Sequence, residues 1–208
     1  QREELRSAKI LLGVYERPVD LGFDLRSKTF EVFSYRYALV TSGRFEEYSG
    51  EILDRISRGE FVILVGPKGV GKSVLARYSL AKALSTGFFV VYEVEQGILM
   101  QLKKLGGVLN TFGKWPVIFY DPSAPEYYEL DFEEVGFEEA PEIKKIRNAV
   151  INLISAYKRW KKSGINTSIV VVLPNDIFDT IKERVEKARK KGVKLTILEV
   201  DLRQADFL

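Results

Sequence analysis

The chain has 208 residues, of which 46% are hydrophobic and 29% are charged, and its formal net charge is +3. This composition is typical of one sizeable α/β domain, and so small a net charge gives little reason to expect a nucleic-acid partner. Cysteine and histidine are absent, which excludes disulfides, thiolate chemistry, imidazole bases and the usual zinc ligands.

No run of residues approaches the roughly 18 apolar residues of a membrane span, and no signal peptide is visible, so we expect a cytoplasmic protein. Glutamate and lysine are abundant while asparagine and glutamine are sparse, which resembles the composition of thermophile proteins. The chain begins at Gln1, and its only methionine is Met100, so we expect a piece of a longer chain.

Residues 1–50 match no motif, and we expect them to form an extension that packs on a core at 51–208. Residues 2–13 look helical, and a turn follows around Pro18. The segment 29–41 is compatible with a strand or with a buried helix. Its aromatic residues, together expected to pack on a sheet edge, are Phe30, Phe33, Tyr35 and Tyr37.

After a predicted helix at 44–58, strand and helix signals alternate along the chain. The predicted strands are 61–65, 87–95, 115–121, 167–173 and 194–200, and the predicted helices are 72–85, 97–105, 141–162 and 176–190. Continuous apolar strands separated by helices indicate a parallel sheet that is covered on both faces. We therefore expect an α/β three-layer sandwich with a mainly parallel five-stranded sheet.

The sequence GPKGVGKS at 66–73 matches the pattern G-x-x-x-x-G-K-[ST] between a predicted strand and a predicted helix. Polyphosphate needs several donors that converge on one point, and glycines let the backbone wrap closely with its amides turned inward. The N-terminus of the following helix adds a positive end. The expected phosphate-binding residues are Gly66, Pro67, Lys68, Gly69, Val70, Gly71, Lys72, Ser73 and Val74.

On this motif the chain resembles the P-loop NTPases over roughly residues 50–201. The resemblance implies a nucleoside triphosphate with Mg²⁺ as the ligand, Lys72 on the β and γ phosphates, and the Ser73 hydroxyl on the metal. Because no N-K-x-D motif for guanine is present, we expect ATP.

Asp121 ends the apolar strand PVIFYD and resembles the Walker B aspartate, which holds the metal together with Ser73. Many AAA+ ATPases place a catalytic glutamate next, but this chain has Pro122. In RecA-like and KaiC-like ATPases that glutamate ends the strand after the P-loop helix, which favours Glu95 here. Three alternatives remain open, namely Glu93 in the same strand and Glu126 or Glu129 in the loop DPSAPEYYELDFEE.

The strand end VVVLPND resembles the sensor 1 position, which would place Asn175 beside the γ phosphate, although turn and helix-cap chemistry explains it equally well. Within the P-loop NTPases the chain resembles the additional-strand division, and within that division the AAA+ and archaeal-type or RecA/KaiC-like ATPases. This resemblance implies the sheet order 5-1-4-3-2. The chain stops soon after Asp201, so a helical lid has been cut away or the branch has none. Candidate arginine fingers, for which surface ion pairing is the alternative, are Arg184, Arg189 and Arg203.

Two basic stretches, 157–162 and 182–194, lie near predicted helix C-termini, where cations interact favourably with the helix dipole, and this is the favoured interpretation. The alternative is a nucleic-acid partner in which Trp160 would stack on a base. The acidic and aromatic loop 122–140 is expected to cover a groove or dock on a partner, or else to pack on itself.

The leading hypothesis is an ATPase that hydrolyses Mg-ATP to drive a conformational change in a homo-oligomer or a larger assembly. The alternative is a nucleotide-dependent switch with little hydrolysis, which the presence of Pro122 favours. A small-molecule kinase is a third hypothesis, but the stretch after Asp121 is acidic where such kinases carry an arginine-rich lid.

Overall fold

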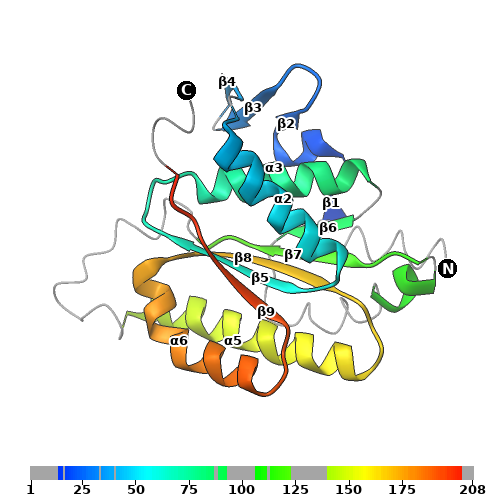
Figure 1. Ribbon diagram of the computed structural model, residues 1–208, viewed down its shortest axis with the longest axis vertical. Coiled ribbons are helices and arrows are strands. Elements are labelled where there is room, and N and C mark those ends of the chain that lie inside the picture. The colour runs from blue at the N-terminus through cyan, green and yellow to red at the C-terminus, as the bar shows by residue number, and fades with distance from the viewer. Residues whose placement is uncertain are drawn as a thin grey trace.

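The computed structural model describes residues 14–15, 17–32, 34–39, 41–86, 89–92, 106–111, 113–122 and 140–202. These residues form a six-stranded sheet with helices on both faces and a separate three-stranded antiparallel sheet near the N-terminus (Figure 1). Within these ranges no helix combines the length and the apolarity that crossing a membrane requires.

Five parallel strands make up most of the large sheet: β5 (Phe61–Gly66), β6 (Phe89–Tyr92), β7 (Pro116–Tyr120), β8 (Ser168–Pro174) and β9 (Leu195–Glu199). A sixth strand, β1 (Val14–Tyr15), pairs antiparallel with β6. The strands lie in the order β1-β6-β7-β8-β5-β9, so the parallel strands, numbered along the chain from β5, follow the order 5-1-4-3-2. The expected five-stranded sheet is corrected to six strands, because β1 returns from the N-terminal region to pair with the edge of β6.

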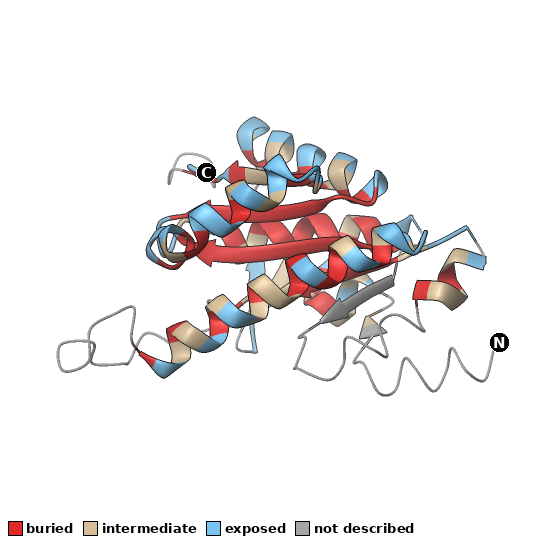
Figure 2. Cartoon of the chain, turned by 90° about the horizontal axis from the view of Figure 1, so that it is seen from below, coloured by how far each residue is buried: buried red, intermediate tan, exposed pale blue. Residues whose placement is uncertain are grey.

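Four helices cover the sheet. They are α2 (Gly43–Ser57) and α3 (Lys72–Ser85) on one face, and α5 (Pro141–Lys162) and α6 (Asn175–Lys190) on the other (Figure 1). Residues 106–111 are also helical. Figure 2 shows the strands buried between the two helical layers. The predicted three-layer α/β architecture is therefore present.

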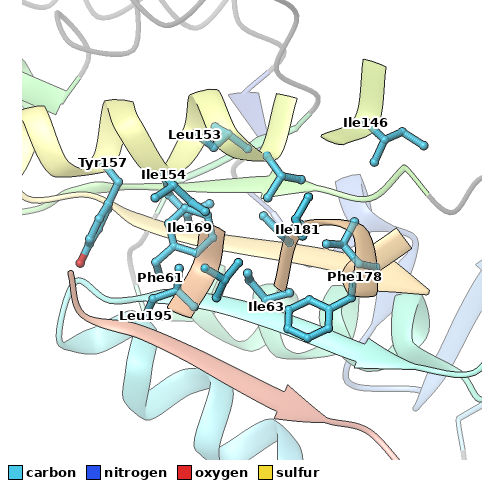
Figure 3. Close-up of a cluster of buried hydrophobic side chains, with 14 of the residues drawn as sticks. Phe61, Ile63, Ile146, Leu153, Ile154, Tyr157, Ile169, Phe178, Ile181 and Leu195 are labelled. Atoms are coloured by element: carbon cyan, nitrogen blue, oxygen red, sulfur yellow. The ribbon is translucent and has the colours of Figure 1, made fainter. Parts of the chain in front are cut away.

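The continuous apolar run of β5 results from burial on both faces. Phe61, Ile63 and Val65 belong to the core beneath α5 and α6, whereas Val62 and Leu64 belong to the core beneath α2 and α3. Successive side chains of a strand point to opposite faces, so a strand that is covered twice needs apolar residues at every position. Figure 3 shows this packing for Phe61 and Ile63 against side chains of α5 and α6.

The segment 29–41, which the sequence leaves open, forms a β-hairpin. β3 (Thr29–Val32) pairs with β4 (Tyr35–Ala38) and with β2 (Phe23–Asp24), and the short helix η1 (Pro18–Leu21) contacts α3. Tyr35 is 68% exposed and Tyr37 is 49% exposed, so their expected packing on a sheet edge is wrong. The reason is that β4 is the outer strand of a separate sheet and has all four of its residues exposed.

Most other predicted elements are present within a few residues of their expected bounds, and α3 begins and ends as predicted. The predicted helices at 2–13 and 97–105, together with Phe33, lie outside the described residues. A domain boundary at residue 50 stays a prediction, although α2 spans that position.

Candidate functional site

The loop between β5 and α3 has the backbone geometry that a phosphate cradle requires. Gly69 and Gly71 adopt φ values of 80° and 84°, in the left-handed region that favours glycine. Gly71 is the residue that caps α3, and no side chain caps that helix end. The first amide groups of a helix have no partner within the helix, so the start of α3 offers donors to an anion.

Gly66 serves a different purpose from the other two glycines. A Cβ atom at this position would lie 2.6 Å from the carbonyl oxygen of Val200. The amide of Val200 donates to the carbonyl of Val65 at 2.7 Å, which draws the end of β9 against β5. The first glycine of the motif therefore lets two neighbouring strands pack closely at the base of the loop.

Lys72 lies beneath the loop and is only 5% exposed. Its Nζ donates to the carbonyl oxygens of Gly66, at 2.9 Å, and of Pro67, at 2.6 Å. Burial lowers the pKa of Lys72, and the negative charges of Asp121 and Asp176 act in the opposite direction. The ammonium group is thus held at the loop by main-chain oxygens, and the charges of two carboxylates favour its protonated form.

Both carboxylates follow the ends of neighbouring strands. Asp121 comes directly after β7 and is partly buried. Asp176 is exposed and is the second residue of α6, the helix that begins directly after β8. β8 lies between β5 and β7, and the carboxyl ends of parallel strands meet at one edge of the sheet. This topology explains why both charges influence Lys72.

Asp176 is the residue that sequence reasoning missed. The pattern PND directs attention to Asn175, which is the first residue of α6 and is exposed. The overlooked signal was that Asp176 also follows the end of a buried strand.

The remaining loop residues divide by exposure. Pro67, Lys68 and Gly69 are exposed, whereas Val70, Gly71, Ser73 and Val74 are partly exposed. The loop thus presents backbone at the surface. Among the residues that the structure describes, no three acidic side chains come together as a ready-made metal site.

Several predicted residues lie outside the described ranges: Glu93, Glu95, Glu126, Glu129 and Arg203. Arg184 and Arg189 are exposed on α6, about 14 and 21 Å along the helix from its first residue. Arg189 pairs with Glu186 at 3.1 Å, as in the alternative of surface ion pairing. Their role as arginine fingers stays a prediction.

The suggested base-stacking role of Trp160 is wrong. Its side chain is 5% exposed and belongs to the core beneath α5 and α6. Trp160 follows Tyr157 and Ile154 at helical spacing, on the same buried face of α5. That spacing was the signal that could have placed it in the core.

No protein-family model and no curated protein matches the chain. Among solved structures, a chain of the Saccharomyces cerevisiae Hsp104:casein complex in its extended conformation is similar, with a TM-score of 0.43, 12% identity, and coverage of 81% of this chain and 28% of that chain. A chain of the HORMA:CdnC:Trip13 complex of Escherichia coli MS115-1 has a TM-score of 0.44 and 11% identity, with 77% and 64% covered.

A closed-state reconstruction of Hsp104 with ATPγS and FITC casein has a TM-score of 0.41 and 16% identity, with 77% of this chain and 28% of that chain covered. The chain thus spans about a quarter of the Hsp104 chains that it resembles, since 28% of each is covered. At these TM-scores the likeness adds nothing to the case for a function, which depends on the residues described above.

Proposed function

We propose that this chain binds ATP with Mg²⁺ in the loop 66–73 and hydrolyses it to drive a conformational change in a larger assembly. The observation that carries the proposal is the position of Lys72. This lysine is buried under a glycine-rich loop at a helix N-terminus, where the charges of Asp121 and Asp176 reach it. A buried cation is unfavourable unless it is compensated, and such an arrangement is typical of a site for polyphosphate.

The residues fit the ligand on three counts. The left-handed Gly69 and Gly71 let the backbone curve toward an anion, and the start of α3 supplies amide donors. Mg²⁺ bound with a nucleotide needs only one or two protein ligands, because phosphates and water complete its octahedron. A hydroxyl at Ser73 and a carboxylate at Asp121 are the ligand types that this cation prefers.

We assign the roles as follows. Lys72 would turn from the carbonyl oxygens of Gly66 and Pro67 toward the β and γ phosphates. Ser73 and Asp121 would hold the metal, and Asp176 would orient a metal-bound water or Lys72 itself. Bound Mg-ATP would supply the transferable γ-phosphoryl group and the cation that offsets its charge. Glu95 would orient the attacking water, and Asn175 would position it.

A switch that hydrolyses ATP slowly is the second candidate, and Pro122 favours it. This buried proline directly follows Asp121, so the position offers no side chain that can take a proton from water. The switch and the ATPase would share the same binding residues and would differ only in turnover.

Binding is tested by calorimetry with Mg-ATP on the wild type, Lys72→Ala and the control Lys182→Ala, which removes an exposed lysine of α6. We expect Lys72→Ala to weaken binding about 10- to 100-fold, because a charge-assisted hydrogen bond to phosphate contributes about 1.5–3 kcal/mol. Lys182→Ala should bind like the wild type. Equal affinities of all three proteins for Mg-ATP would refute the proposal.

Turnover separates the two candidates. If the chain is an ATPase, Glu95→Gln should retain Mg-ATP binding and lose hydrolysis about 100-fold or more, since general-base catalysis contributes about 10²–10⁴-fold. If the wild type hydrolyses ATP no faster than Lys72→Ala while still binding it, the switch is correct. Asp176→Asn, compared with Asp121→Asn, shows whether the additional carboxylate affects turnover, binding or neither.

A further inference from the structure

A basic groove lies between α5 and α6, on the face of the sheet opposite α2 and α3. The two helices run side by side beneath the sheet (Figure 1) and enclose a cavity of about 280 Å³. Four cationic side chains line it: Lys158 from α5, Arg184 and Lys187 from α6, and Lys191 just after α6. We call this cavity the α5–α6 groove.

Within the part of the chain that the structure describes, the positive charge of the α5–α6 groove is not compensated by ion pairs. None of the four cations forms an ion pair with a described residue, and no acidic residue lines the cavity. Favourable interaction with a helix dipole explains only cations of the last turn. Lys158 and Arg184 lie before the last turns of their helices, so they need another explanation.

The floor of the α5–α6 groove is apolar. Ile151 and Ile154 contribute from α5, and Ala188 and Val193 close the other side and pack against the main core. A cavity with an apolar floor and a cationic rim favours a ligand that carries both carboxylates and apolar side chains. Nucleic acid is disfavoured, because the nearby aromatic side chains that could stack on bases are buried: Tyr157 is 2% exposed and Trp160 is 5% exposed.

The sequence contains a segment of the complementary chemistry. Residues 123–139 carry seven carboxylates and no lysine or arginine, together with two tyrosines and two phenylalanines. The whole chain has a net charge of +3, so the remaining residues carry +10 once these seven negative charges are taken away. One chain thus holds a strongly acidic, aromatic segment and an uncompensated basic groove.

We propose that the α5–α6 groove binds the acidic segment 123–139 of a second copy of this chain. The segment joins α5 at that helix's first residue, whereas the groove spans positions about 15 to 26 Å further along the helix. The segment is tied at both ends, after β7 and before α5, and an extended chain covers at most about 3.3–3.6 Å per residue, so within its own copy only the middle of the segment can reach the groove. A second copy can present its segment without that constraint, in a head-to-tail contact. This inference does not depend on nucleotide binding.

The test is self-association of the full chain, measured by analytical ultracentrifugation over a range of protein concentrations at low and high salt. We expect the wild type to associate and to dissociate at high salt, because exposed charge pairs are screened. Lys158→Glu with Lys187→Glu reverses the groove and should weaken association about tenfold or more. Lys182→Glu with Lys190→Glu makes the same charge change on exposed positions of α6 outside the groove, and it should associate like the wild type.

A mixing experiment identifies the occupant. Glu133→Lys with Glu134→Lys reverses the charge at two positions of the segment, and this protein alone should also associate about tenfold or more weakly than the wild type. An equimolar mixture of the groove-reversed and segment-reversed proteins should associate again, since each supplies the charge that the other lacks. Circular dichroism of each protein shows that it is folded.

Three results would overturn the proposal: a wild type that is monomeric at every concentration, a groove reversal that leaves association unchanged, or a mixture that stays monomeric. Groove-dependent binding of a single-stranded oligonucleotide by a monomeric wild type would assign the groove to nucleic acid and would also refute the proposal.

Discussion

The two sheets of this protein differ in how far their strands are buried. In β5 and β8 of the large sheet every residue is buried, and the helices α2, α3, α5 and α6 cover both faces. In β4 of the small sheet every residue is exposed. The small sheet is attached through η1 and a row of aromatic rings that leads from Tyr78 through Phe23 and Phe30 to Tyr37.

This difference indicates where stability and function reside. Regions with many buried apolar contacts open only with the whole protein, whereas regions with few open locally. The glycine-rich loop 66–73 and the carboxylates Asp121 and Asp176 all follow strands or begin helices that form or cover the large sheet. The candidate site is therefore built on the region that we expect to be most stable, and the small sheet contributes none of the residues assigned to it.

The largest effect is expected from Phe61→Ala in β5. Phe61 is 0% exposed, and its ring meets that of Tyr157 edge-on with centroids 5.7 Å apart. Truncation should lower the free energy of unfolding by about 3–5 kcal/mol, measured by urea denaturation. The matched change in the small sheet, Tyr35→Ala, should stay within about 0.5 kcal/mol. If Phe61→Ala and Tyr35→Ala lowered the free energy of unfolding by similar amounts, the two sheets would not differ in their contribution to stability.

Gly66→Ala should have the next largest effect. The added methyl group would meet the main-chain oxygen of Val200, which cannot move without disturbing β9. We expect a loss of about 1–3 kcal/mol in the free energy of unfolding, as for an overpacked core. Gly192→Ala is the comparison, because Gly192 has φ 83° and open space around it, so it reports backbone strain alone. A neutral Gly66→Ala would show that β5 and β9 need no close approach.

Phe30→Ala should affect the small sheet more than the large one, although Phe30 also packs against the core beneath α2 and α3. The ring of Phe30 stacks between those of Phe23 and Tyr37, at centroid distances of 5.8 and 5.5 Å. Two such pairs are together worth about 1–3 kcal/mol. Hydrogen exchange should accelerate in β3 and β4 and stay unchanged in β5 and β8. Faster exchange in the large sheet would show that the two sheets unfold together.

The smallest effect concerns Glu46, which ties α2 to α3. Its carboxylate accepts hydrogen bonds from Tyr78 at 2.6 Å and Lys82 at 2.8 Å. Burial alone would raise the pKa of Glu46, but the hydrogen bonds from Lys82, Tyr78 and Thr41 outweigh it and lower the pKa below its ordinary value of 4.5. A lowered carboxylate pKa stabilises the fold above the unfolded-state value, and that stability is lost as pH falls through the folded-state pKa.

Glu46→Gln should therefore reduce the free energy of unfolding by less than about 1 kcal/mol at pH 7, since the pair is partly exposed. The difference from the wild type should shrink as pH falls below 4.5. Denaturation curves at several pH values measure this, with Glu47→Gln, an exposed neighbour on α2, as the control. A difference that is constant down to pH 3 would rule out the ionised Glu46 as its source.

Most helices and strands and the glycine-rich loop 66–73 are predictable from the sequence, because both depend on local patterns. Continuous apolar runs predicted β5 and β8, and the glycine spacing predicted a loop whose Gly69 and Gly71 adopt positive φ. These features need no knowledge of distant residues, since hydrophobic periodicity and glycine's freedom act within a few positions.

Which residues distant in sequence come close together is visible only in the tertiary structure. Placing β8 between β5 and β7 brings the charge of Asp176 to Lys72, which lies more than a hundred residues earlier in the chain. The pairing of α5 with α6 turns Trp160 into the core and gathers cations from two helices around one groove. Contacts between residues that are distant in sequence depend on how the helical layers pack on the sheet. The sequence of one strand or helix does not specify which other element will cover it.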